Sequence, residues 1–150
     1  MNADTLTHWL RTKKNILARI CYGIVFLIHK HNQYLTGIQV RLETNIGGGL
    51  RFQHFSGIVI NEGCKIGKHV LIFQGVTVGL GTGGIPNIGD NVVICAGSKI
   101  IGGVHIGNNV IIGANAVVTH NVPDGAVVVG IPAKIISYNA KDKIPDYMVH

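Results

Sequence analysis

A chain of 150 residues is long enough for one ordinary domain with its own core. It is too short for a cofactor domain plus a separate substrate domain. Glycine accounts for 21 residues, about twice its usual share, and Asp, Glu, Lys and Arg make up only 13%. The apolar content of 47% excludes an intrinsically disordered chain, and the formal charge of +6 predicts attraction for anions of an unspecified kind.

The first 36 residues are predicted to form an N-terminal helical cap. Apolar residues recur at three- and four-residue spacing between positions 5 and 31, which favours one or two amphipathic helices. The apolar stretch from Ile20 to Ile28 is shorter than the ~20 residues that a membrane-spanning helix needs. We interpret it as the buried or membrane-facing side of a helix, which leaves peripheral membrane contact open.

A six-residue repeat dominates the middle of the chain. Each of its ten positions is Ile or Val: Ile60, Ile66, Ile72, Val78, then after a four-residue insertion Ile88, Ile94, Ile100, Ile106, Ile112 and Val118. Four residues after most of these comes a second small or β-branched residue: Val70, Val76, Val92, Ser98, Val104, Val110, Ala116 and Val122. A fainter extension runs backward through Val40, Ile46 and Phe52.

This period fits neither an α-helix nor a simple strand alternation, but it fits a coil of short strands and turns. The aliphatic residues then point inward, and glycines such as Gly67, Gly89 and Gly107 are expected to supply a positive φ at the corners. The sequence thus predicts an all-β fold, a parallel β-helix over residues 37–138. A strand over Lys134 to Tyr138 closes its far end, and the tail 139–150 is predicted to be mobile.

Three segments give this pattern a family resemblance: Phe52 to Ile60 (FQHFSGIVI), Phe73 to Gly79 (FQGVTVG) and Gly130 to Ile135 (GIPAKI). In their order and spacing they resemble the hexapeptide-repeat acyltransferases, and within them the serine acetyltransferase branch. The resemblance implies a left-handed β-helix, usually trimeric, and transfer of acetyl from acetyl-CoA to a hydroxyl.

Acetyl transfer to an alcohol needs a base, and histidine suits this role because its ordinary pKa lies near neutrality. Among eight histidines the resemblance singles out His54 as the catalytic base. Fifteen residues earlier, where the serine enzymes carry an aspartate, this chain has Gln39. An amide can orient the imidazole ring but cannot supply a charge, so Gln39 is expected to be a neutral ring-orienting group.

Two further departures concern the acceptor. Gln53 and the pair Gly84-Ile85 stand where the serine enzymes carry residues that bind the amino acid. We therefore expect a sugar hydroxyl as acceptor, in an O-acetyltransferase resembling those of surface-polysaccharide biosynthesis. Serine O-acetyltransferase, making O-acetylserine for cysteine biosynthesis, is the alternative.

For acetyl-CoA as co-substrate, the resemblance implies a groove between neighbouring β-helices of a homotrimer. Gly79 and Gly81 match the glycine turn of the family, Ala96 and Ala114 match its small pantetheine-facing positions, and Lys134 occupies the site of a basic residue near the CoA phosphates.

A competing class is a non-catalytic or zinc-dependent β-helix protein. His69 and His105 lie in the right region but 36 residues apart, without the spacing of a zinc triad, so no metal is expected. The cysteines Cys21, Cys64 and Cys95 are odd in number and widely separated, which fits a reducing, cytoplasmic location. The sequence has no basic stripe interleaved with aromatic residues, so a nucleic acid partner is not expected.

Overall fold

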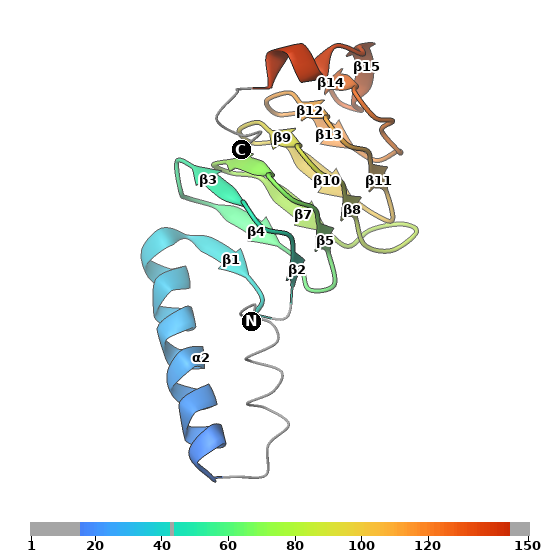
Figure 1. Ribbon diagram of the computed structural model, residues 1–150. Coiled ribbons are helices and arrows are strands. Elements are labelled where there is room, and N and C mark those ends of the chain that lie inside the picture. The colour runs from blue at the N-terminus through green and yellow to red at the C-terminus, as the bar shows by residue number, and fades with distance from the viewer. Residues whose placement is uncertain (1–15, 43, 145–150) are drawn as a thin grey trace.

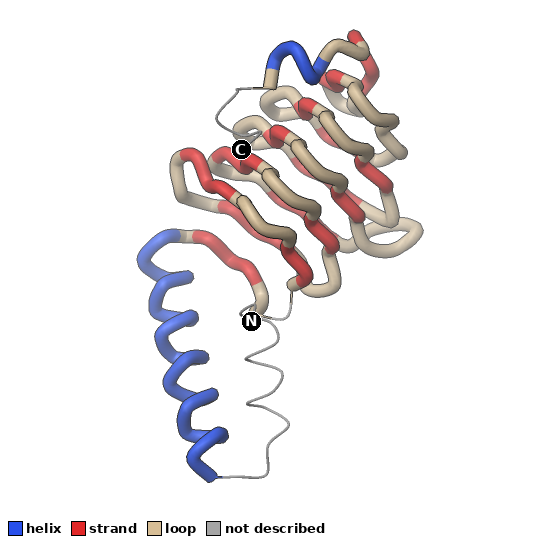
Figure 2. Tube along the Cα trace, in the orientation of Figure 1, coloured by secondary structure: helices blue, strands red, loops and turns tan. Residues whose placement is uncertain are grey.

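The computed structural model describes residues 16–42 and 44–144, which form one N-terminal helix and a left-handed parallel β-helix. The β-helix has three sheets, with strand orders β1-β4-β7-β10-β13, β2-β5-β8-β11 and β3-β6-β9-β12-β14-β15. Each sheet takes every third strand of the chain as far as β13, and β14 and β15 then extend the third sheet. Figure 1 shows the coils stacked in chain order away from the helix, and Figure 2 shows loops joining the short strands at the corners. The predicted fold class is confirmed.

The elements have the following bounds in chain order: α2 Ile16–Thr36, β1 Ile38–Val40, β2 Asn45–Ile46, β3 Arg51–Gln53, β4 Ile58–Ile60, β5 Lys65–Ile66, β6 Leu71–Phe73, β7 Thr77–Gly79, β8 Asn87–Ile88, β9 Val93–Ile94, β10 Lys99–Ile101, β11 His105–Ile106, β12 Ile111–Ile112, β13 Val117–Val118, β14 Val127–Val129, β15 Lys134–Ser137 and the 3-10 helix η1 Ala140–Lys143.

The six-residue repeat forms the core. All ten of its positions from Ile60 to Val118 are at most 3% exposed, and the second row from Val70 to Val122 is at most 6% exposed. Parallel register aligns equivalent residues, so Ile72 pairs with Ile94 and Ile94 with Ile112. Each aliphatic side chain therefore packs on its equivalent in the next coil, which makes burial one-dimensional along the axis.

The glycines at the corners have a different role from the one predicted. Gly67, Gly89 and Gly107 do not have a positive φ. Left-handed backbone occurs two residues later, at His69, Asn91 and Asn109, with φ between 53° and 56°. The glycines are needed because the next coil passes too close for a side chain: a Cβ on Gly67 would lie 2.5 Å from the backbone of Gly89.

This contact gives a testable prediction. Gly67→Ala forces two coils apart and is expected to lower the free energy of unfolding by about 1–3 kcal/mol, as overpacking usually does. Gly48→Ala is the matched control, since a Cβ on Gly48 meets nothing within 4 Å. Urea titration of both variants measures the difference. Equal midpoints for the two would show that the coils yield freely at this corner.

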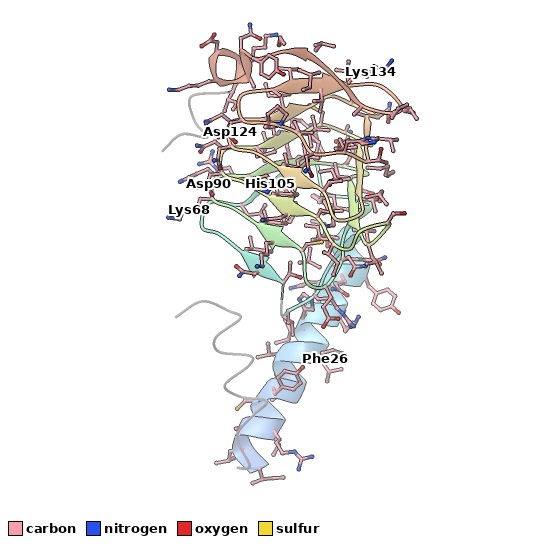
Figure 3. The ribbon with its side chains drawn as sticks, turned by 90° about the vertical axis from the view of Figure 1, so that its right-hand side faces the viewer. Phe26, Lys68, Asp90, His105, Asp124 and Lys134 are labelled. Carbon is pink, nitrogen blue, oxygen red and sulfur yellow. The ribbon has the colours of Figure 1, made fainter. Side chains whose placement is uncertain are left out.

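One corner also carries a ladder of side-chain to backbone hydrogen bonds. The amide of Lys68 donates to Asp90 Oδ1 at 2.7 Å, that of Asp90 to Asn108 Oδ1 at 2.8 Å, and that of Asn108 to Asp124 Oδ1 at 2.8 Å. Figure 3 shows Lys68, Asp90 and Asp124 one above another along this edge. The ladder satisfies corner amides that the sheets leave unpaired.

Helix α2 ends at Thr36, where Gly37 adopts a φ of 66°. Its last turns cap the free edge of β1: the carbonyl of Val40 accepts from Gln33 Nε2 at 2.7 Å, and His29 Nε2 lies 2.8 Å from the same oxygen. None of the α2 residues is buried. In the part of the chain that the structure describes, no helix has the length and apolar character needed to cross a membrane.

The far end is closed as predicted by a strand, β15, which runs antiparallel to β14. The chain beyond it forms the 3-10 helix η1, in which Ala140 is buried and donates its amide to the carbonyl of Gly125 at 3.1 Å. Ile144 packs on Leu71 and Val93 outside the core. The remainder of the predicted mobile tail lies outside the described residues.

Candidate active site

His54 lies in the turn between β3 and β4, and its side chain is exposed. Its backbone is left-handed, with a φ of 58°, and Gly57 in the same turn has a φ of 61°. The turn interrupts the regular step between Phe52 and Ile60, so the imidazole stands outside the core. Phe55, directly after His54, is 66% exposed. The imidazole is therefore accessible to a bound ligand and could accept a proton from it, and the ring of Phe55 beside it is uncovered.

The His54 turn heads a column of stacked corners. The amide of Gly75 donates to Ser56, that of Gly97 to Gln74 and that of Asn115 to Ala96, each at 2.9 Å. These bonds join the turn after β3 to the turns after β6, β9 and β12, one coil apart. Ala96 and Ala114, two of the predicted cofactor-binding residues, therefore lie along the same corner as the His54 turn.

The other predicted cofactor residues lie elsewhere on the β-helix. Gly79 ends β7, and Gly81 exchanges backbone hydrogen bonds with Gly84 at 3.0 and 3.1 Å in the inserted loop. A Cβ on Gly81 would lie 2.9 Å from the amide of Gly102, so the loop packs tightly on the next coil. Lys134 begins β15, is exposed, and lies at the end opposite α2 (Figure 3).

Gln39 is exposed in the middle of β1, opposite Val59. Among the described residues, no hydrogen bond joins its amide to His54, and its ring-orienting role stays a prediction. Gln39 instead lines a pocket of about 340 Å³ together with Lys30 and Gln33 of α2. The sequence analysis missed this pocket. The three-residue spacing of Lys30 and Gln33 places them on one helix face, but nothing in the sequence shows that this face meets β1.

Lys99 is a second residue that the sequence analysis missed. It projects outward from β10 and donates from Nζ to the carbonyl of Gly75 at 2.5 Å. Gly75 belongs to the corner in the coil next to the His54 turn. The ammonium group of Lys99 therefore adds a positive charge to this column of corners.

Two of the cysteines, Cys64 and Cys95, are poor nucleophiles in this fold. Burial raises the pKa of the Cys64 thiol, outweighing the effect of nearby backbone hydrogen bonds, and burial also raises the pKa of the Cys95 thiol. Both side chains therefore stay protonated near neutral pH, whereas the thiolate is the reactive form. The raised pKa values of these two thiols disfavour an acyl-enzyme on either of them.

The histidines considered for zinc lie on different features. His69 occupies a left-handed corner with a φ of 53°, and His105 is exposed on β11. Within residues 16–42 and 44–144, no three His, Cys, Asp or Glu side chains gather in a way that could hold a metal ion.

Comparison with known proteins identifies relatives of this architecture. Residues 86–120 match the family model described as bacterial transferase hexapeptide (six repeats). Serine acetyltransferase of Staphylococcus xylosus is 43% identical over 87% of this chain and 59% of its own length. A solved serine acetyltransferase in complex with CoA is 33% identical, with a TM-score of 0.73, over 89% of this chain and 54% of its own.

A third relative is the serine acetyltransferase of Neisseria gonorrhoeae in complex with serine. It is 32% identical, with a TM-score of 0.71, over 88% of this chain and 53% of its own length. The chain thus spans little more than half the length of the relatives it matches.

These relatives contradict the expected sugar acceptor. That expectation rested on Gln53 and the pair Gly84-Ile85, yet proteins named serine acetyltransferase match this chain at 40–46% identity. Gln53 is exposed at the end of β3, and in the inserted loop Ile85 is exposed and Gly84 is half-buried. Such positions are insufficient to assign an acceptor.

The repeat, the β-helix and the relatives agree over most of the chain. This chain belongs to the hexapeptide-repeat acyltransferase superfamily, in which it resembles the serine acetyltransferase branch.

Proposed function

We propose that this chain catalyses transfer of acetyl from acetyl-CoA to the hydroxyl of L-serine. The observation that carries the proposal is the similarity to serine acetyltransferases over 87% of the chain, at 43% identity, which includes the His54 turn. The solved relatives complexed with CoA and with serine support the two substrates.

In the proposed reaction, His54 accepts the proton of the serine hydroxyl as the oxygen attacks the thioester carbonyl. The tetrahedral intermediate then collapses, the carbon–sulfur bond breaks, and the CoA sulfur leaves as a thiol after taking the proton back from the imidazole. The proton taken from serine thus ends on the CoA thiol, and the reaction needs no acyl-enzyme. The raised thiol pKa values of Cys64 and Cys95 support this direct route.

The pantetheine arm of CoA is proposed to run along the corner column that carries Ala96 and Ala114. Small side chains at these positions leave the backbone accessible to an extended ligand. The inserted loop with Gly79 and Gly81 lies at another corner, and it would border this groove from a neighbouring copy of the chain. Lys134 would supply a positive charge for the CoA phosphates.

We further propose that the groove is completed by neighbouring copies in a homotrimer. In this assembly a neighbouring copy would cover the exposed ring of Phe55 beside His54. Light scattering is expected to give a mass of about 48 kDa, three times the 16.0 kDa of the chain.

A thiol-release assay with acetyl-CoA tests the reaction. The protein is given L-serine, L-threonine or L-homoserine in turn, so that the three acceptors share the amino acid backbone and differ around the hydroxyl. The proposal predicts the highest kcat/KM with L-serine. Release that does not depend on any of the three would reject it.

A further inference from the structure

The turn that carries His54 is longer than the equivalent turn of the next coil. The register of the flanking strands places residues 54–58 at the same corner as residues 74–76, so the first turn holds two extra residues. Residues 54–57 are all exposed. Because none of them is anchored in the core, the position of the imidazole depends on contacts that the turn makes at the surface of the β-helix.

The corner of the next coil supplies such a contact. Among the described residues, one hydrogen bond joins the two corners: the amide of Gly75 donates to the carbonyl of Ser56 at 2.9 Å. The backbones also lie close together, since a Cβ on Gly57 would lie 3.7 Å from Gly75 Cα. The position of the His54 turn therefore depends on how firmly Gly75 is held.

Lys99 holds Gly75 from the other side. It lies on β10, which flanks β7 on the side away from β4. Its side chain is half-buried, and its Nζ donates to the carbonyl of Gly75 at 2.5 Å. Within the part of the chain that the structure describes, no carboxylate pairs with this ammonium group. A hydrogen bond from a charged donor is about twice as strong as one between neutral groups. Gly75 thus links Lys99 to Ser56, with its carbonyl bound on one side and its amide on the other.

The strand itself does not require a lysine at this position. The residues paired with Lys99 in the neighbouring strands are Thr77 and Val117, which are short and β-branched, as is usual in a sheet. Ordering a long lysine side chain also costs conformational entropy. The contact with the Gly75 corner accounts for a long charged side chain here, where the packing of the sheet does not.

We propose that Lys99 is a positioning residue for the His54 base and acts through the Gly75 corner. The inference rests on the proposed function, because it concerns the step in which His54 accepts the serine proton. Lys99 contacts neither substrate in this scheme. Its ammonium group fixes the corner that supports the His54 turn, which keeps the imidazole within reach of the hydroxyl. A misplacement of about 1 Å can cost about 10²-fold in rate.

Removing the ammonium group tests the inference. Lys99→Met keeps most of the length of the side chain but cannot donate to the carbonyl of Gly75. We expect kcat for acetyl transfer to L-serine to fall about 10- to 100-fold, while KM for L-serine and for acetyl-CoA stays unchanged. Lys99→Arg keeps a charged donor and should restore most of kcat. An unchanged kcat in folded Lys99→Met would overturn the inference.

A double-mutant cycle shows whether Lys99 acts through His54. In the His54→Asn protein the base is already absent, so adding Lys99→Met should not lower kcat further. An equal fall in kcat in both backgrounds would overturn the inference, because Lys99 would then act independently of the base. A rise in KM for acetyl-CoA in both backgrounds would also overturn it, since Lys99 would then contact this substrate directly.

Lys65→Met is the matched control, because Lys65 is exposed on β5, which belongs to a different sheet from β10. Its kcat and KM should equal those of the wild-type protein. Circular dichroism establishes that each variant is folded. If Lys99→Met failed to fold, Lys99→Gln, which keeps an uncharged donor, would replace it in every comparison.

Hydrogen exchange without substrates separates this inference from the proposed function. Since the amide of Gly75 is bonded to Ser56, a looser corner exposes this amide to solvent more often. Mass spectrometry of peptides covering residues 54–60 and 73–79 is expected to show faster exchange in Lys99→Met than in Lys65→Met or the wild-type protein. Unchanged exchange would overturn the inference whatever the activity. If exchange is faster but the wild-type protein transfers no acetyl, the link from Lys99 to the His54 turn stands and the transferase proposal falls.

Discussion

Replacing Ile94 with aspartate is expected to abolish cooperative folding. Ile94 is fully buried in β9, between Ile72 and Ile112 of the neighbouring coils. The variant loses about 2–5 kcal/mol of packing, and a carboxylate without a partner adds a desolvation cost of several kcal/mol. Their sum reaches the whole stability of an ordinary domain, about 5–15 kcal/mol. Circular dichroism during thermal unfolding measures the effect.

Asn87→Asp is the control for this prediction. Asn87 lies on β8 with its side chain exposed, so the same acidic group enters the same β-helix without burial. We expect a native spectrum and a cooperative transition for Asn87→Asp. A cooperative transition for Ile94→Asp at the wild-type temperature would contradict the assignment of the inward-facing row.

The largest effect on activity is expected for His54→Asn. Removing a general base typically costs a factor of about 10²–10⁴ in rate. Asparagine is chosen because the left-handed backbone at His54, with a φ of 58°, is tolerated by this residue. The fold should therefore be retained while kcat/KM for L-serine falls. Thiol release from acetyl-CoA, with L-serine varied, gives the ratio.

His105→Ala serves as the matched control, since His105 is an exposed histidine on β11, in a different sheet from the strand that follows the His54 turn. Its activity should equal that of the wild-type protein. If folded His54→Asn kept wild-type kcat/KM, His54 would have no part in proton transfer.

The core residues could be predicted from the sequence because each six-residue repeat forms one side of a coil, and successive coils stack in register. Every Ile or Val from Ile60 to Val118 on the six-residue step is buried. The backward extension is weaker for a physical reason: Phe52 is 37% exposed because its coil is the first, with only the edge-capping side chains of α2 beyond it. The role of the corner glycines could not be predicted from the sequence. A side chain at Gly67 would clash with the backbone of Gly89, and this clash depends on the distance between coils.

The candidate site was only partly predictable. Ala96 and Ala114 stand eighteen residues apart, about one coil, so their common corner follows from the repeat. The pocket around Lys30 and Gln39 does not follow from any local pattern. It depends on the direction in which α2 leaves β1, which is held by side-chain contacts of His29 and Gln33 with the carbonyl of Val40. Such contacts between distant groups leave no periodic signal in a sequence.

The central claim is that this chain acetylates the hydroxyl of L-serine, and the product tests it most directly. The full chain is incubated with L-serine and acetyl-CoA carrying ¹³C in the acetyl group, and the products are identified by mass spectrometry. The account predicts ¹³C-labelled O-acetylserine, formed at a rate that saturates with L-serine. Absence of labelled O-acetylserine from a folded, wild-type protein would contradict it.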